Sequence, residues 1–193
     1  INRSGEHLLS LINDILDMAK IEAGKVTLTA VPFDLSDMLG ELEMMFRLRA
    51  EAKHLRFEVR RDALSQLSLE ADKGRIRQVL VNLLGNAVKF TETGSVVLRV
   101  STQYRGNDAL ILSCAVEDTG PGIAQDEQAK LFQAFAQSES GRQTTGGTGL
   151  GLAISRELIR LMGGEIMLSS EPGTGSTFYF GIPVRRGDAG TMT

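Results

Sequence analysis

Hydrophobic and polar positions follow two different periods along this chain, and each change of period separates helices from strands. Apolar residues that recur every three to four positions predict helices over residues 4–24, 35–46, 73–90, 126–135 and 150–164. Alternation of apolar with polar residues predicts strands over residues 26–31, 55–60, 67–71, 95–101, 109–117, 165–170 and 176–183. Asp34 and Asp72 precede two of the helices as expected N-caps, and Gly24 and Gly163 follow two others as stops.

The order of these segments predicts a two-layer α/β sandwich, in which helices cover one face of a mixed sheet. Strands come as neighbouring pairs rather than in strict alternation with helices, which argues against a doubly wound parallel sheet. The closing segment "RRGDAGTMT" is polar, and we expect it to be disordered.

The first helix carries an apolar stripe at heptad spacing, made of Leu8, Ile12, Ile15 and Ala19. Such a stripe either packs on its own domain or belongs to a helical bundle. Leu9 and Leu16 widen the stripe, which favours the bundle. Because the chain begins without Met inside a helical pattern, we expect it to be part of a longer protein.

Composition narrows the class of protein. Of the 193 residues, 42% are hydrophobic and 23% are charged, which suits a globular core. A net charge of −3 gives no reason to expect nucleic acid as a partner, and no apolar run reaches the ~20 residues that cross a bilayer. The single cysteine, Cys114, excludes an internal disulfide. We expect a cytoplasmic domain that binds no nucleic acid.

One face of the helix over residues 73–90 is polar. Gln78, Asn82, Asn86 and Lys89 recur at spacings of four, four and three residues, roughly opposite the leucines. A carboxamide oxygen can ligate Mg²⁺, and an ammonium group can contact phosphate. The row therefore faces either a phosphate chain or, more plainly, solvent.

Two glycine-containing segments extend this chemistry. In "EDTGPGI", Asp118 ends a strand; an ionised carboxylate there accepts hydrogen bonds, which suits the amino group of adenine, although turn aspartates are common. The stretch "RQTTGGTGLGLAIS" is neither a P-loop nor a G-x-G-x-x-G motif. Its glycines make either a flexible linker or a phosphate site at a helix start, with "SGRQTTGG" as a mobile lid.

Taken in order, "QVLVNLLGNAVKF", "DTGPGI", "LFQAF", "GGTGLGLAIS" and "GTGSTF" resemble the N, G1, F, G2 and G3 boxes of two-component sensor histidine kinases. The likeness implies an ATP-binding catalytic domain over residues 27–186 and a tail over 187–193. Residues 1–26 are similar to the second helix of the dimerisation and phosphotransfer domain, and their sequence looks most like that of the hybrid kinases.

The resemblance also implies an activity and partners. The γ-phosphoryl group of ATP, bound with Mg²⁺, would pass to a histidine on a preceding helix and then to an aspartate in the receiver domain of a response regulator. The catalytic domain would work with its own dimerisation helices in a homodimer, in a full-length protein that can be anchored in the inner membrane.

Carried over position by position, the resemblance makes Asn86 the Mg²⁺ ligand, with Asn82 and Lys89 assisting. Asp118 would bind adenine with Thr177 beside it, and two phenylalanines would support the lid. The full set of implied nucleotide-site residues is Asn82, Asn86, Lys89, Phe90, Asp118, Gly120, Gly122, Ile123, Phe132, Phe135, Gly147, Thr148, Gly149, Leu150, Gly151, Leu152 and Thr177.

Two departures from related proteins change the expected activity. No "H-E-x-R-T-P" acceptor motif is present; His7 looks like a solvated helix position and His54 like a helix-end residue, so this chain should bind ATP without phosphorylating itself. Asn82 stands where related gyrase, mismatch-repair and chaperone ATPases have a water-activating glutamate, and an amide cannot act as a general base. The alternatives are an ATP-sensing interaction module, or a related ATPase or serine kinase of the same fold.

Overall fold

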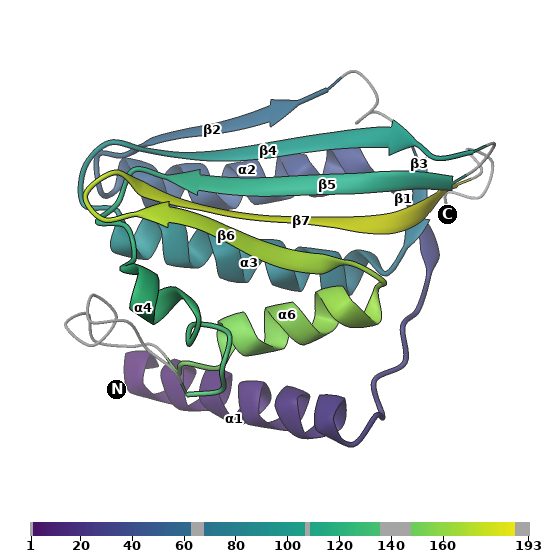
Figure 1. Ribbon diagram of the computed structural model, residues 1–193, viewed down its shortest axis with the longest axis horizontal. Coiled ribbons are helices and arrows are strands. Elements are labelled where there is room, and N and C mark those ends of the chain that lie inside the picture. Colours follow the sequence, from purple (N-terminus) through teal and green to yellow (C-terminus); the bar gives the residue numbers. More distant parts are fainter. Residues whose placement is uncertain (1, 63–67, 107–108, 136–147, 188–193) are drawn as a thin grey trace.

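A single open sheet forms one layer of the molecule, and the helices gather on one of its faces (Figure 1). This computed structural model describes residues 2–62, 68–106, 109–135 and 148–187. The strands are β1 (Val31–Asp34), β2 (Arg56–Arg61), β3 (Ser68–Ala71), β4 (Ser95–Tyr104), β5 (Ala109–Asp118), β6 (Glu165–Glu171) and β7 (Gly175–Arg186).

The sheet is mixed. Its strands follow the order β1-β3-β7-β5-β4-β2, and β6 pairs with β7 beside this path. The β2–β4 pair is parallel, and the other pairs are antiparallel. The predicted fold class is confirmed.

The helices do not all lie at the same distance from the sheet. They are α1 (Asn2–Glu22), α2 (Leu35–Glu51), α3 (Lys73–Phe90), α4 (Gln125–Gln128) and α6 (Gly151–Leu161). Figure 1 shows α2 and α3 against the sheet, and α1 on the far side of α6. Among the described residues, no helix combines the length and apolar character that crossing a membrane requires.

The core fills the space between the sheet and the helices that cover it. The largest fully buried side chains are Phe46, Leu35, Met38, Leu39, Leu42, Leu69, Ile76, Leu80, Leu83, Leu84, Leu98 and Leu110. On α3, the apolar residues roughly opposite the polar row are buried, as the leucine pattern predicts; they are Ile76, Val79, Leu80, Leu83, Leu84 and Ala87. Burial of one such side chain contributes about 1.5–3 kcal/mol, so this layer supplies most of the driving force for folding.

Both predicted N-caps are confirmed. The Oδ1 atom of Asp34 accepts hydrogen bonds from the backbone N–H groups of Ser36 and Asp37, at 2.6 and 3.2 Å. Asp72 accepts one from the N–H of Arg75 at 2.9 Å. Caps of this kind typically contribute ~1 kcal/mol, and they fix where α2 and α3 begin.

Three predicted elements need correction. Residues 26–30 form no strand; Thr29 instead donates its N–H to Asp72, and β1 starts later, on a sheet edge that tolerates Pro32. The helix expected over 126–135 ends at Gln128, whose side-chain amide bonds the carbonyl groups of Ile123 and Ser170. Residues 185 and 186, the first two of the closing segment that was expected to be disordered, belong to β7, and residues 188–193 lie outside the described ranges.

Candidate functional site

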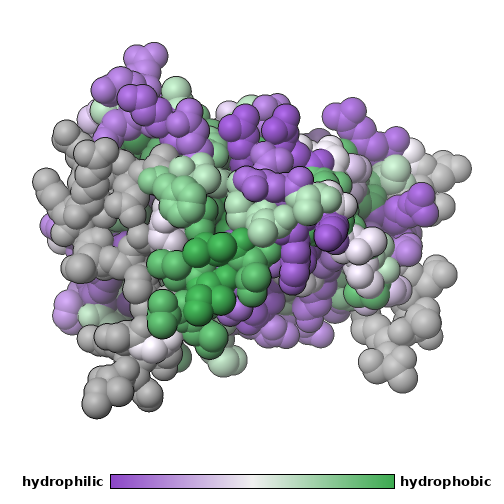
Figure 2. All heavy atoms as spheres, turned by 90° about the horizontal axis from the view of Figure 1, so that it is seen from below, coloured by the Kyte–Doolittle hydropathy of each residue, from purple (hydrophilic) through white to green (hydrophobic). Residues whose placement is uncertain are grey.

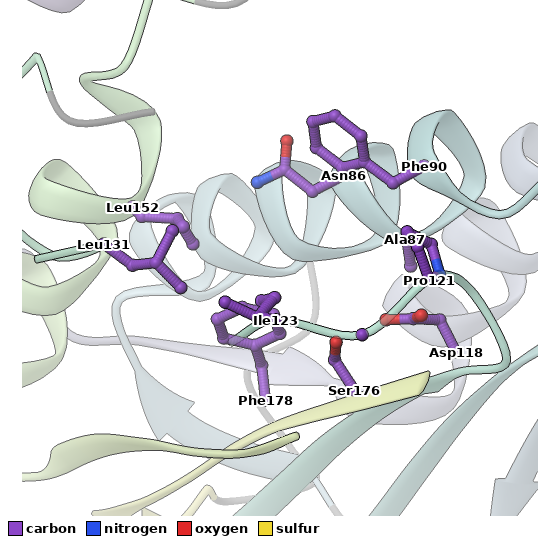
Figure 3. Close-up of a pocket in the computed structure, with 11 residues that line it drawn as sticks. Asn86, Ala87, Phe90, Asp118, Pro121, Ile123, Leu131, Leu152, Ser176 and Phe178 are labelled. Atoms are coloured by element: carbon purple, nitrogen blue, oxygen red, sulfur yellow. The ribbon is translucent and has the colours of Figure 1, made fainter. Parts of the chain in front are cut away.

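A pocket opens between the C-terminal half of α3 and the strands β5 and β7 (Figure 3). It holds about 480 Å³ of space, counting its open mouth. Its lining residues are Asn86, Ala87, Phe90, Asp118, Pro121, Gly122, Ile123, Leu131, Leu152, Ser176 and Phe178. Apolar walls with a few polar groups are typical of pockets for small organic ligands.

Asp118 supplies the acidic group of this pocket. It ends β5, and its Oδ1 atom accepts the N–H of Gly120 at 2.8 Å. Burial raises the pKa of Asp118 above its usual value, and backbone hydrogen bonds to Gly120 and Ser176 offset this only in part. The side chain is therefore a partly desolvated acceptor, which a ligand N–H group can complete.

The position assigned to Thr177 is corrected by the strand register. Ser176 is the residue opposite Asp118, whereas Thr177 pairs with Glu117. Side chains alternate between the two faces of a strand, so Ser176 and Phe178 face the pocket together and Thr177 does not. The period-two pattern of this strand was the signal that would have identified Ser176 and Phe178 as pocket residues.

The turn after Asp118 depends on Gly122. Its φ angle is +69°, and a Cβ atom added there would lie 2.1 Å from the carbonyl oxygen of Glu171. A side chain at this position would thus be strained and would push β6 away from the pocket. Ile123 follows in the pocket wall, and its N–H donates to Ser170 at 2.9 Å.

The polar row on α3 divides into two halves. The amide of Gln78 donates to Asp17 of α1 at 2.8 Å, and that of Asn82 donates to Ser155 of α6 at 2.9 Å. Asn86 instead lines the pocket, where no hydrogen bond joins its side chain to another described residue. The first half of the row joins helices, and the second half presents an open amide. It is not simply a solvated face.

Lys89 and Phe90 form the end of α3 at the pocket. The Lys89 Nζ atom lies 5.0 Å from the centroid of the Phe90 ring, within the range of a cation–π contact. Burial lowers the pKa of Lys89 from its usual value. The site therefore has a cation beside a pocket-lining aromatic ring.

The segment that leads into α6 is held from two sides. Thr148 donates its hydroxyl to Asp14 of α1 at 3.0 Å, and the same oxygen accepts the N–H of Leu150 at 3.2 Å. A Cβ atom on Gly151 would lie 2.3 Å from the Oδ1 atom of Asn82, so α6 begins in direct contact with α3. Gly149, between Thr148 and Leu150, has a φ angle of +70°.

Two neighbouring leucines at the start of α6 have different surroundings. The Leu150 side chain lies in the core, which leaves only its backbone for a ligand, whereas Leu152 lines the pocket. Gly147 and the rest of the expected lid, residues 140–147, lie outside the described residues.

The two phenylalanines assigned to lid support are placed differently. Phe132 packs edge-on against Phe178 of the pocket wall, at 6.3 Å between ring centroids, with the Arg156 guanidinium 5.7 Å from its ring centroid. Phe135 is 71% exposed and has a φ angle of 63°; its N–H donates to the carbonyl of Gly149 at 3.0 Å. Phe132 supports the pocket itself, and Phe135 touches the segment before α6 through its backbone.

Several pocket residues were not predicted. Ala87, Pro121, Leu131, Ser176 and Phe178 all line it. Ala87 directly follows Asn86, and Pro121 lies within the predicted turn, so adjacency alone could have found them. Leu131 directly precedes the predicted Phe132, but its place in the pocket wall depends on where α4 ends.

Comparison with known proteins agrees with this geometry. A profile of the histidine kinase-, DNA gyrase B- and HSP90-like ATPase family matches residues 71–186. The sensor histidine kinase GacS of Pseudomonas protegens is 43% identical over 98% of this chain and 21% of its own length. The circadian input-output histidine kinase CikA of Synechococcus elongatus is 46% identical over 95% of this chain and 24% of its own length.

Solved structures show the same likeness in three dimensions. Full-length ShkA in complex with AMPPNP matches 97% of this chain and 38% of its own, with a TM-score of 0.80 and 37% identity. The Acinetobacter baumannii histidine kinase AdeS covers 93% of this chain and 80% of its own, with a TM-score of 0.72 and 27% identity.

The chain belongs to the histidine kinase-, DNA gyrase B- and HSP90-like ATPase family, and the match to its profile covers more than half of the residues. Within that family it is a catalytic domain of the sensor histidine kinase type, homologous to these kinases over nearly its whole length. It spans 21 to 24% of the length of the two curated relatives named above.

Proposed function

We propose that the pocket binds ATP together with Mg²⁺, and that the domain transfers the γ-phosphoryl group to a histidine on another helix. The observation that carries this proposal is the partly desolvated Asp118 carboxyl at one side of an apolar pocket, with the Asn86 amide, which no other described residue hydrogen-bonds, at the other (Figure 3). A carboxylate acceptor, apolar walls and the side-chain amide of Asn86 suit an adenine nucleotide whose phosphates extend toward the mouth of the pocket.

At the adenine end, Asp118 accepts the exocyclic amino group, because an ionised carboxylate can only accept hydrogen bonds. Ile123 and Phe178 supply apolar wall on the side of the sheet. Guanine has a carbonyl oxygen at the corresponding position, which would meet the carboxylate with like polarity. The pocket should therefore prefer adenine.

At the phosphate end, Asn86 is the proposed Mg²⁺ ligand and Lys89 the proposed phosphate contact. The residues fit this cation: Mg²⁺ takes oxygen ligands, keeps several waters and is shared with substrate phosphates. Among the described residues, no cluster of three or more His, Cys, Asp or Glu side chains could hold a metal ion by itself. When bound, Mg²⁺ neutralises phosphate charge; Asn86, Lys89 and the first N–H groups of α6 position the phosphates.

The chemistry of this site favours phosphoryl transfer over hydrolysis. Asn82 lies where a water-activating carboxylate would be needed, and its amide is already bonded to Ser155. An amide cannot accept a proton from water at neutral pH, so bound ATP should wait for an aligned acceptor. This reading makes the related ATPase activity the weaker alternative.

The N-terminal helix supports the assignment of residues 1–26 to a dimerisation and phosphotransfer domain. Leu8 and Leu9 are 58% and 61% exposed, and Ile12, Ile15 and Leu16 extend the same apolar patch. Figure 2, seen from the side of α1, shows apolar side chains gathered on this face. A patch of this kind on one helix suits packing against bundle helices in a homodimer.

The remaining steps belong to the whole protein and form part of the same proposal. The phosphorylated histidine would pass its phosphoryl group to the receiver domain of a response regulator. The catalytic domain, over residues 27–186, would act in the cytoplasm, with or without a membrane anchor elsewhere in the protein.

A nucleotide titration tests the proposal. We expect calorimetry to show that Mg²⁺–ATP binds this chain and that GTP binds much more weakly. Asp118→Ala should weaken ATP binding by roughly 1–3 kcal/mol, since it leaves the adenine amino group unmatched. Equal affinity for ATP and GTP in the parent chain would contradict the role given to Asp118.

A further inference from the structure

Lys53 makes an unusual set of contacts just behind the pocket. Its Nζ atom donates hydrogen bonds to the carbonyl oxygens of Val88, Lys89 and Thr91, at 2.7, 2.9 and 2.8 Å. These carbonyls belong to the last turn of α3 and to the residue that follows it. One ammonium group from a distant segment thus binds three acceptors at the end of one helix.

This arrangement satisfies a general need of helix ends. The last four carbonyl groups of a helix have no partner within it, and the helix dipole makes that end negative. An ammonium group has three donors on a compact positive centre, which matches three converging carbonyls. Lys53 therefore both caps α3 and neutralises its C-terminal end.

The turn that Lys53 holds is also the turn that builds the pocket. Asn86, Ala87 and Phe90 line the pocket from the final part of α3. Any rotation or fraying of this turn would move the Asn86 amide and the Phe90 ring together.

The same contact reaches the adenine end. Thr91 is fully buried, and a Cβ atom on Gly120 would lie 3.3 Å from its Oγ1 atom and 2.8 Å from the Oδ1 atom of Asp118. The backbone of Thr91 is held by Lys53 on one side, and its side chain packs behind the Asp118 turn on the other. Lys53 is thus linked through one residue to the adenine acceptor.

The end of α2 places Lys53 for this task. The helix ends at Glu51, and the N–H of Leu55 bonds back to the carbonyl of Ala50 at 2.9 Å. His54 adopts a φ angle of 58°, and the buried Leu55 side chain anchors the turn in the core. The backbone on both sides of Lys53 is therefore fixed, and the side chain crosses to α3 from a rigid base.

We propose that Lys53 is a positioning residue for the nucleotide site: it fixes the C-terminal turn of α3, and through that turn the Asn86 amide and the Phe90 ring. The proposal rests on the nucleotide-binding function proposed above. It concerns orientation of the pocket wall, because the Lys53 ammonium contacts carbonyl groups of the helix end and not the lining side chains themselves.

The test compares Lys53→Met with a control variant that should lose a similar amount of stability at a site away from the pocket. Lys53→Met keeps the apolar stem and removes all three donors. Asp34→Ala removes the N-cap of α2, at the opposite end of the helix that precedes Lys53. Both variants of this 193-residue chain are titrated with Mg²⁺–ATP at a temperature where denaturant curves show each to be fully folded.

We expect Lys53→Met to raise the Kd for Mg²⁺–ATP about tenfold, and Asp34→Ala to leave it unchanged. The side-chain amide signals of Asn86 in NMR spectra should move in Lys53→Met and stay in place in Asp34→Ala. Parent-like affinity of folded Lys53→Met would overturn the proposal, as would an equal loss of affinity in the control.

Lys53→Arg keeps the proposal testable if Lys53→Met does not fold. Arginine retains the charge, but its planar fork cannot direct three donors from one centre to converging carbonyls. Folded Lys53→Arg should bind Mg²⁺–ATP more weakly than the parent and show shifted Asn86 signals; parent-like affinity and spectra would overturn the proposal. A parent chain that binds no ATP would instead refute the proposed function, so the two failures are distinguishable.

Discussion

Asp118 and Ser176 lie opposite each other on β5 and β7. The carboxyl group of Asp118 is partly desolvated by burial, and it is hydrogen-bonded by the backbone of Ser176. The pair joins the last residue of one strand to the second residue of another, at the edge of the pocket. Because burial raises the pKa of Asp118, the folded protein favours the protonated form more than the unfolded chain does.

This relationship predicts a pH-dependent trade-off at Asp118. The pKa of Asp118 is higher in the folded protein than in the unfolded chain, so ionisation of Asp118 lowers the free energy of unfolding at higher pH. Below the unfolded pKa of about 3.9, Asp118 is protonated in both states and this cost is absent. We expect nucleotide-free Asp118→Asn to unfold at higher urea concentration than the parent at pH 7, and the difference to vanish as the pH falls toward 4 and below. Its affinity for ATP should nevertheless be lower, because an amide is a weaker acceptor than a carboxylate.

Urea curves at several pH values and one calorimetric titration check both halves. A variant that is less stable than the parent at pH 7, yet equal to it in acid, would reverse the inferred sign of the pKa shift. Glu117→Gln is a suitable control, since that neighbouring carboxylate pairs with Arg99 outside the pocket.

A second prediction separates two residues one turn apart on α3. Asn86→Ala should abolish the part of the ATP affinity that depends on Mg²⁺, because its amide is the proposed ligand. Leu83→Ala should mainly reduce the free energy of unfolding, by roughly 2–5 kcal/mol, because Leu83 is 1% exposed in the core. Titrations with and without Mg²⁺, together with urea curves, measure both effects. Unchanged metal dependence in Asn86→Ala would remove Asn86 from the metal site.

Sequence reasoning succeeded where one local rule determined an element. Helix α3 was predicted with its cap and its buried stripe, because Asp72 and an unbroken leucine pattern agree with each other. It failed for residues 26–30, where alternation alone cannot tell a paired strand from a segment that passes the Asp72 cap. Lys53 carried no signal at all, since its three acceptors lie at least 35 residues away along the chain.

The third prediction concerns two glycines with opposite surroundings. Gly122→Ala should destabilise the fold by at least ~1–2 kcal/mol and weaken nucleotide binding, because φ is +69° and the new Cβ atom would meet the Glu171 carbonyl. Gly85→Ala, inside α3, meets nothing within 4 Å and should stabilise the helix by ~1 kcal/mol. Thermal melts of both variants check this; a neutral Gly122→Ala would show that the turn can relax.

The turn beside Lys53 provides a fourth prediction. His54 holds a φ angle of 58° with an exposed side chain, so the residue contributes strain and little packing. His54→Gly should relieve ~1–2 kcal/mol of strain and lose ~0.5–1 kcal/mol to the freer unfolded chain, for a small net gain. The melting temperature should rise by a few degrees or less, whereas His54→Val should lower it clearly. Higher stability of the valine variant would contradict the assigned backbone conformation.

The last prediction is that this chain binds ATP but neither labels itself nor hydrolyses ATP appreciably. Its two histidines, His7 and His54, stand outside any acceptor motif, and His54 lies in the strained turn at the end of α2. Positioning dominates phosphoryl transfer, so nucleotide without an aligned acceptor should remain intact.

Addition of a helix that carries the acceptor motif should allow acid-labile, base-stable labelling, with dimerisation through the α1 stripe. Incubation with γ-labelled ATP, followed by acid and base treatment, measures this directly, and Asn86→Ala joined to the same helix serves as the control. Stable label on the present chain, at either histidine or at a hydroxyl group, would overturn the proposed transfer to a separate helix. Labelling that appears only with the added helix, and disappears in the Asn86→Ala control, would support both the acceptor and the metal assignments.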